Sequence, residues 1–236
     1  MVTSELFFSR LVDLFHKKRI ISIAGKSATG KTTLALQLVS KLLTSCRSDK
    51  VSCLWIQASE LFPKKRLIKM YENSPDLLSY ILKHIFITPS NCVLMTYSEQ
   101  EKLIKKITDN SFIYPSNLRY VVIDNITHHF RYELSQKIGV QKAVLAIDDF
   151  FNRQIFPLVM FCERKDICII LIHEVSFNPP LGEDKMSFFK VYERIKALNV
   201  FLNTSPISNK GTIIIKSKKA PLTHNYYISN SGIELV

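Results

Sequence analysis

Apolar residues follow two different periods along this chain. Over residues 4–17, large apolar side chains recur every three or four positions, which predicts an amphipathic helix. Unbroken apolar runs are typical of buried strands, and they occur at 20–24, 51–56, 84–87, 119–124 and 166–173. Segments with helical spacing lie between or beside these runs, at 33–39, 75–83, 98–108 and 140–165. Because strands alternate with helices, we expect an α/β fold whose mostly parallel sheet is covered on both faces.

Three features modify this pattern. Pro157 falls inside the helical stretch 140–165 and predicts a kink or break there. Residues 176–187 contain two adjacent prolines and a glycine, which predict a loop. Near the end, the apolar runs 211–215 and 226–228 flank a lysine-rich turn and predict an antiparallel pair of strands.

The length of 236 residues suits one α/β domain, and two full domains would be cramped. We find no internal repeat and no linker, so residues 1–236 are predicted to form one domain, in which 1–19 are a lead-in helix. No apolar run is long enough to span a bilayer, and charged residues interrupt the first apolar stretch. The expectation is a soluble, cytoplasmic protein without membrane contact. The five scattered cysteines show no metal-binding spacing and suit buried reduced thiols.

A phosphate-binding pattern, G-x-x-x-x-G-K-T, occupies residues 25–32, between a predicted strand and a predicted helix. The backbone N–H groups of such a loop, together with the helix N-terminus, can surround the phosphates of a nucleotide. The Lys31 ammonium is expected to reach the β- and γ-phosphates, and the Thr32 hydroxyl to bind Mg²⁺. The predicted nucleotide-binding residues are Gly25, Lys26, Ser27, Ala28, Thr29, Gly30, Lys31, Thr32 and Thr33. The sequence therefore predicts a site for a nucleoside triphosphate.

The second half of such a site requires a carboxylate at the end of another strand. The run 119–124 ends in Asp124, at the strand end where open α/β sheets place ligands, so Asp124 is predicted to hold Mg²⁺. The other interpretation of Asp124 is an ordinary cap of a loop. A strand and helices separate the loop from Asp124, which favours the larger ATPases that use an extra carboxylate to activate water. Glu60 is the candidate for that base, and the alternative is a solvated loop residue.

Four segments, taken in order, match a known pattern. The first is the loop at 25–32. The second is 55–67, which matches at Ile56, Phe62, Arg66 and Leu67; the third is 121–131 and the fourth is 169–175. Together with the lysine-rich ending, these segments resemble the ATPase core of the RecA/RadA recombinase superfamily, and most of all its small archaeal RadA paralogues of the RadB type. The resemblance spans nearly the whole chain and implies a RecA-like P-loop ATPase core that binds ATP and Mg²⁺.

The departures from the family pattern concern catalysis and assembly. Ser59 stands where the family has its catalytic Glu, Glu174 stands where it has a Gln that senses the γ-phosphate, and Pro63 replaces an Arg near the adenine. Lys31, Glu60, Asp124 and Glu174 are therefore the candidate catalytic residues, and hydrolysis is expected to be slow. The chain has no Phe-x-x-Ala polymerisation motif, and with 19 residues before the first strand we expect no helix-hairpin-helix domain. The resemblance thus implies an accessory paralogue whose partner is a RadA-type recombinase or another paralogue, in a homo- or hetero-oligomer.

The net charge of +12 is compatible with a nucleic-acid partner, although a lysine-rich surface without a partner is the alternative. After 175, basic residues alternate with aromatic residues, a mixture that suits single-stranded DNA. The same residues could form an amphipathic helix with its aromatic side chains in the core. The lysines of the terminal turn could instead discourage sheet pairing. The candidate DNA-binding residues are Arg131, Lys137, Lys185, Lys190, Arg194, Lys216, Lys218 and Lys219.

Three functions are compatible with these observations. The leading hypothesis is an ATP-binding accessory protein of DNA repair and homologous recombination, associated with the nucleoid or, in a eukaryote, with the nucleus. The second is a RecA-fold signalling ATPase that acts through protein contacts without DNA. The third, a small-molecule kinase, would need an arginine-bearing lid, and the sequence contains no compact arginine cluster.

Overall fold

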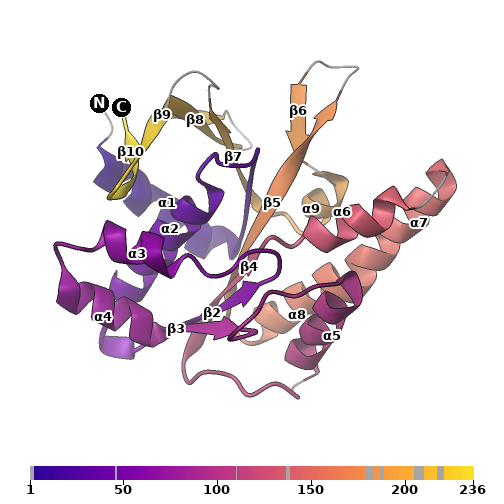
Figure 1. Cartoon of the computed structure of the whole chain (residues 1–236), viewed down its shortest axis with the longest axis horizontal. Helices are drawn as coiled ribbons and strands as arrows, with labels where there is room; N and C mark the ends of the chain where they lie inside the picture. Colours follow the sequence, from indigo (N-terminus) through magenta and orange to yellow (C-terminus); the bar gives the residue numbers. More distant parts are fainter. Residues whose placement is uncertain are drawn as a thin grey trace.

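In the computed structural model, a twisted sheet separates two layers of helices (Figure 1). The structure describes residues 3–45, 47–109, 111–136, 139–178, 183–186, 189–204, 210–216 and 221–236, with the backbone alone at 176–178, 183–186 and 189–190. The strands are β1 (Ile20–Gly25), β2 (Ser52–Gln57), β3 (Ile85–Thr88), β4 (Leu118–Asp124), β5 (Cys168–Asn178), β6 (Glu183–Met186), β7 (Leu198–Thr204), β8 (Lys210–Ile215), β9 (Leu222–Ser229) and β10 (Gly232–Leu235). The helices are α1 (Ser4–Lys18), α2 (Lys31–Ser45), η1 (Arg47–Asp49), α3 (Lys64–Met70), α4 (Pro75–His84), α5 (Tyr97–Thr108), α6 (His128–Ser135), α7 (Val140–Phe150), η2 (Phe151–Ile155), α8 (Phe156–Arg164) and α9 (Phe189–Arg194).

The strands lie in the order β10-β9-β8-β7-β1-β5-β4-β2-β3. Pairs from β7 to β3 are parallel, and β8, β9 and β10 add an antiparallel extension on one side. The predicted α/β fold with a mostly parallel sheet and a C-terminal antiparallel hairpin is therefore confirmed. The phosphate-loop strand and the Asp124 strand were predicted to be separated along the chain only; in the sheet, β5 lies between β1 and β4.

Both faces of the central strands are buried, which explains their unbroken apolar runs. In β5, Ile170 and Ile172 face one core, and Ile169 and Leu171 face the other. The first core is closed by helices of the N-terminal half, including α1 and α2, and the second by α5, α8 and neighbouring helices. Alternate residues of one strand point to opposite faces, so a strand between two helical layers needs an apolar residue at every position.

The long helix predicted over 140–165 is interrupted. A turn of π-helix, η2, joins α7 to α8, and Pro157 lies in the first turn of α8. Pro157 has no N–H to donate to the preceding turn, which fits a π-helical turn at this point. The irregularity predicted at Pro157 is therefore present as a π turn just before it, within a helical backbone that runs on from α7 to α8.

The loop predicted over 176–187 is wrong in part. The strand β5 continues to Asn178 and pairs in antiparallel fashion with β6, with Val175 opposite Met186. The pair projects as a hairpin past the carboxyl ends of the neighbouring strands (Figure 1). Residues 179–182 lie outside the described residues. Pro179, Pro180 and Gly182, on which the loop prediction depended, all fall in that range, between the last residue of β5 and the first of β6.

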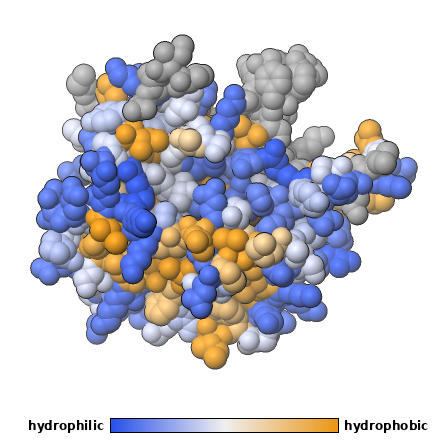
Figure 2. Space-filling model, viewed as in Figure 1, coloured by the Kyte–Doolittle hydropathy of each residue, from blue (hydrophilic) through white to orange (hydrophobic). Residues whose placement is uncertain are grey.

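Apolar side chains also reach the surface. Figure 2 shows them gathered on the lower half of one face, and the exposed large apolar residues include Leu61, Phe86, Met95 and Ile113. Within the described ranges, no helix is long and apolar enough to cross a bilayer. The described cysteines are unbridged; Cys53, Cys162 and Cys168 are buried as expected, whereas Cys92 is exposed.

Candidate nucleotide site

The predicted phosphate loop connects the end of β1 to the start of α2. Both glycines of the motif are required by close packing: a Cβ on Gly25 would lie 2.5 Å from the Thr29 hydroxyl, and one on Gly30 would lie 2.9 Å from Ile228. Gly30 also has a φ of +88°, which favours glycine. The loop therefore turns tightly into the N-terminus of α2, and this geometry leaves N–H groups available to phosphate oxygens.

Two hydrogen bonds fix the side chains of Lys31 and Thr32 at the phosphate loop. The Lys31 ammonium donates a hydrogen bond to the backbone carbonyl of Lys26 at 2.7 Å, and the Thr32 hydroxyl donates to a carboxylate oxygen of Asp124 at 2.9 Å. The structure thus joins residues that are 92 positions apart. A hydroxyl and a carboxylate are oxygen ligands of the kind that Mg²⁺ prefers.

These residues line a cleft of about 450 Å³. Of the predicted site residues, it includes Ser27, Ala28, Gly30, Lys31, Thr32, Thr33, Glu60, Asp124 and Glu174. The remaining wall contains Arg66, Asn125 and Ile228, which were not among the predicted site residues. The candidate catalytic residues therefore converge on one cleft, at the carboxyl ends of the parallel strands, as expected for an open α/β sheet.

The segment after β2 holds Ser59 and Glu60 at the mouth of the cleft. Gln57 anchors this segment: its side-chain amide donates to the carbonyl of Cys92 at 2.8 Å, and its oxygen accepts from the N–H of Phe62 at 2.7 Å. The Ser59 hydroxyl accepts a hydrogen bond from the N–H of Asn125 at 3.2 Å, and Glu60 is exposed at the rim. The Ser59 hydroxyl is therefore hydrogen-bonded to the backbone next to Asp124, and the Glu60 carboxylate faces solvent.

Glu174 forms an ion pair with Arg131, which lies on α6. Glu174 lines the nucleotide cleft and is also the point at which β5 leaves the sheet toward the β5–β6 hairpin. Arg131 was predicted as a DNA contact, which stays a prediction; in the structure its guanidinium pairs with Glu174 at the nucleotide cleft. A paired carboxylate repels an incoming phosphate less than an unpaired one.

Burial changes the ionisation of both central charges. Desolvation raises the pKa of Asp124 to about 6, even though the hydrogen bond from Thr32 and the charge of Lys31 act in the opposite direction. Desolvation also lowers the pKa of Lys31, against the attraction of Asp124 and Glu60. The cleft therefore holds buried charges whose desolvation opposes their ionisation, and a bound Mg²⁺–nucleotide complex would favour their charged forms.

We predict that Asp124→Asn stabilises the protein without nucleotide at pH 8 by on the order of 2–3 kcal/mol. The pKa of this carboxyl rises from 3.8 to about 6 on folding, so its contribution to stability is present below pH 3.8. That contribution is lost as the pH rises toward 6, because the folded state must then ionise a buried group. Chemical denaturation at pH 4 and pH 8 measures this, with the exposed Asp13→Asn as the control. An equal effect of Asp124→Asn at both pH values would contradict the assignment.

The terminal strands complete the site from the other side. The Tyr226 hydroxyl donates to the carbonyl of Thr29 in the phosphate loop at 2.6 Å, and Gln37 of α2 accepts from the N–H of Ile233 at 2.7 Å. The Arg66 guanidinium donates to the carbonyl of Ser229 at 2.5 Å. These contacts lie about 160 to 200 positions apart along the chain. Arg66 is a matching position of the segment 55–67, but the sequence assigned it no role in the site, and no sequence signal marks Ile228.

The predicted DNA-binding residues lie at two ends of the sheet. Arg131 is at the nucleotide end, whereas Arg194 and Lys216 lie at the opposite end, near the start of β1 and β7. Arg194 pairs with Asp148 at 2.9 Å, and the Lys216 ammonium lies 4.7 Å from the centre of the Phe201 ring. Lys137, Lys218 and Lys219 lie outside the described residues. Lys185 and Lys190 are described by their backbone alone, in β6 and α9.

One aromatic residue of the basic region belongs to the core. Tyr192 is fully buried, and its ring centre lies 4.1 Å from that of His173. For this residue the alternative interpretation, an amphipathic helix with its aromatic face inward, is correct. His173 is buried too and accepts or donates a hydrogen bond with the Ser22 hydroxyl at 2.7 Å.

The residues present fit ATP and Mg²⁺. The loop offers N–H groups and the Lys31 ammonium for phosphates, while Thr32 and Asp124 offer oxygen ligands for a divalent cation. When bound, Mg²⁺ would neutralise charge on the β- and γ-phosphates. Lys31 would orient the same phosphates, and Asp124 would hold the cation directly or through water.

The comparison with solved structures supports the fold. A crystal structure of the RadB recombinase matches with a TM-score of 0.68, covering 93% of this chain and 91% of that chain, at 22% sequence identity. No family model matches the chain, and no curated protein matches it. An identity this low shows a shared architecture and nothing finer. The chain therefore has the RecA-like α/β fold of that recombinase.

Proposed function

We propose that this protein is an ATP-binding accessory factor of homologous recombination and DNA repair. In this proposal it binds single-stranded DNA, modulates a RadA-type recombinase or works with another paralogue, and hydrolyses ATP weakly. The observation that carries the proposal is the position of Glu174. Glu174 lines the nucleotide cleft, and the next residue along β5 begins the pairing with β6. The strand β5 therefore connects the nucleotide cleft directly to the β5–β6 hairpin.

ATP would act mainly as a conformational ligand. A γ-phosphate in the cleft would approach the Glu174 carboxylate and attract its partner Arg131, and so disturb the ion pair. Any shift of Glu174 would be passed to the hairpin that follows it. Slow hydrolysis fits this role, because Ser59 offers a hydroxyl in the place of a water-activating base.

A second candidate is a RecA-fold regulatory ATPase that works through protein contacts alone. It is favoured by the location of the described basic residues, since Arg131 is paired with Glu174 while Arg194 and Lys216 lie at the far end of the sheet. DNA binding distinguishes the two candidates.

We expect the protein to prefer single-stranded over double-stranded DNA, with log K falling by about 0.7 per phosphate contact for each log unit of salt. The combined reversal Lys185→Glu and Lys190→Glu should weaken binding, because it removes two cations from the region after β5. Fluorescence anisotropy with a labelled oligonucleotide, over a series of salt concentrations, measures both effects with and without ATP.

The matched control is Lys102→Glu with Lys105→Glu, two exposed lysines of α5, which changes the net charge by the same amount. Equal losses for the two pairs would indicate a nonspecific charge effect. Binding that does not depend on salt, or no binding to DNA with ATP present, would favour the regulatory ATPase.

A further inference from the structure

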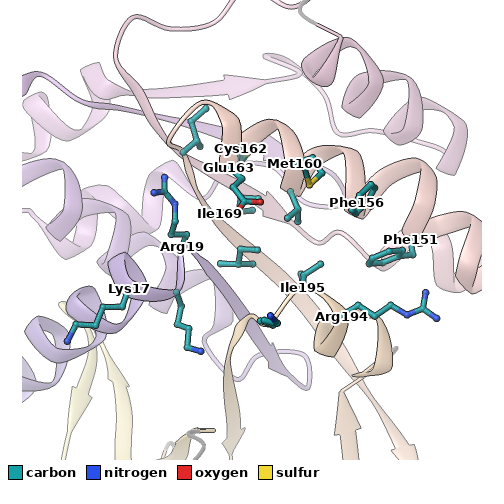
Figure 3. A pocket seen from close by; sticks show the side chains of 15 residues that line it. Lys17, Arg19, Phe151, Phe156, Met160, Cys162, Glu163, Ile169, Arg194 and Ile195 are labelled. Atoms are coloured by element: carbon teal, nitrogen blue, oxygen red, sulfur yellow. The ribbon is translucent and has the colours of Figure 1, made fainter.

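A second concave site lies at the amino ends of the central strands, opposite the nucleotide cleft. This groove, of about 620 Å³, opens between the end of α1, the η2–α8 segment and the end of α9 (Figure 3). Its floor includes Ile20 and Ile169, at the starts of β1 and β5, whereas the nucleotide cleft lies at the strand ends. The length of β1 separates the two sites by roughly 17 Å. We call it the basal groove.

The floor of the basal groove is apolar although it is open to solvent. Nine of its fifteen lining residues are apolar. Phe156, Met160 and Glu163 follow one another at helical spacing along α8, and the exposed fractions of Phe156 and Met160 are 48% and 37%. Large apolar side chains that stay exposed in a concavity of this size are typical of a binding site.

The rim of the basal groove is basic. Five lining residues are cationic, and Glu163 is the single acidic one. Arg19 pairs with Asp166 at 2.6 Å, and Arg194 pairs with Asp148 while its guanidinium lies 5.0 Å from the centre of the Phe151 ring. Figure 3 shows Lys17 and Arg194 on opposite sides of the apolar floor. Within the described part of the chain, no ion pair involves Lys17, Lys18 or Lys196.

We propose that the basal groove binds an acidic amphipathic segment of a partner protein. One or two large apolar side chains of the segment would cover Phe151, Phe156 and Met160, and its Asp or Glu residues would face Lys17, Lys18 and Lys196. Aromatic and apolar anchors in such a pocket carry most of the energy of an interface. The opposite charges at the rim favour encounter and orientation.

Other occupants fit the basal groove less well. A second copy of this chain carries the same net charge of +12, which opposes its approach to a basic rim. A nucleic acid would match the cations, but interfaces with DNA are mainly polar and this floor is mainly apolar. The proposal does not depend on the function of the nucleotide cleft, because the two sites share no lining residue.

The test starts from a random twelve-residue peptide library displayed on phage and selected on the full chain. Peptides retained by a Met160→Glu variant are removed by counter-selection. We expect the remaining peptides to share one or two aromatic or aliphatic residues flanked by Asp and Glu. A failure to enrich such peptides would overturn the proposal.

The binding of a labelled synthetic peptide from this set is then measured by fluorescence anisotropy. Met160→Glu is expected to reduce affinity by about thirtyfold, since it adds to the floor of the site a negative charge that repels the acidic peptide. Lys17→Glu combined with Lys18→Glu should reduce it by about tenfold at low salt. The control pair Lys102→Glu and Lys105→Glu on α5 should leave it unchanged.

Two further measurements keep the outcome decisive. Phe156→Ser, which removes an exposed ring without adding charge, should also weaken peptide binding, and thermal denaturation of each variant shows whether the chain is folded. Equal binding of a peptide with Gln and Asn in place of its acidic residues would contradict the charge argument. Displacement of the peptide by a single-stranded oligonucleotide, with loss of that DNA binding in the Lys17 and Lys18 double variant, would assign the groove to nucleic acid.

Discussion

Replacing Lys31 with alanine is expected to weaken ATP binding by about a hundredfold. The Lys31 ammonium lies at the phosphate loop and donates to a loop carbonyl, so a bound phosphate would receive a charge-assisted hydrogen bond from it. The fold should survive, because burial already lowers the pKa of this lysine and its charge is not a source of stability. Titration of a fluorescent ATP analogue, with thermal denaturation of both proteins, measures the effect.

The control for this variant is Lys106→Ala, which removes an exposed lysine from α5. It should bind the analogue as the unmodified chain does. Wild-type affinity in Lys31→Ala would show that the nucleotide site lies elsewhere. A loss of affinity accompanied by a matching loss of thermal stability would attribute the effect to folding instead.

The second prediction is that hydrolysis is slow, below about one turnover per second, and that Glu174→Gln tightens ATP binding by about tenfold. An ionised carboxylate can only accept hydrogen bonds and repels a phosphate, whereas the Gln amide can donate. The substitution also releases Arg131 from its ion pair, so that the guanidinium becomes available to the nucleotide. Steady-state phosphate release and analogue titrations, with and without single-stranded DNA, give both quantities.

Arg131→Gln is the matched variant for this prediction. It leaves the Glu174 charge without its partner and should weaken ATP binding, so the two substitutions are expected to have opposite signs. Effects of the same sign would mean that the pair acts through local structure and not through charge. A turnover of several per second that is lost in Glu60→Gln would contradict slow hydrolysis and establish Glu60 as the base.

Much of the fold could be predicted because its signals are local. The apolar runs of β1, β4 and β5 are unbroken because both faces of each strand are buried. This burial can therefore be recognised from consecutive residues of the sequence. The phosphate loop is likewise contiguous, and its glycines are explained by contacts of the loop with its immediate surroundings and with Ile228. Asp124 could be identified because it ends a strand, where the sheet places its ligands.

Other parts of the molecule could not be predicted, because they depend on residues that are far apart in the chain. The β5–β6 hairpin forms where the pattern indicated a loop, since antiparallel pairing with β6 satisfies the backbone groups of the strand beyond the sheet. Tyr192 belongs to the core because it packs on His173, a residue of a different element. Its aromatic character alone is equally compatible with base stacking.

The α/β class, the phosphate loop and the residues that could hold a nucleotide and Mg²⁺ can all be predicted from the amino-acid sequence alone. These follow from the period of apolar residues and from a motif of eight consecutive positions. The folded chain is needed to show that Arg131 pairs with Glu174, that Arg66 and Ile228 line the cleft, and that a groove with an apolar floor and a basic rim opens at the far end of the sheet. Side-chain pairs and cavities arise where separate elements pack together, and that packing depends on the whole chain at once.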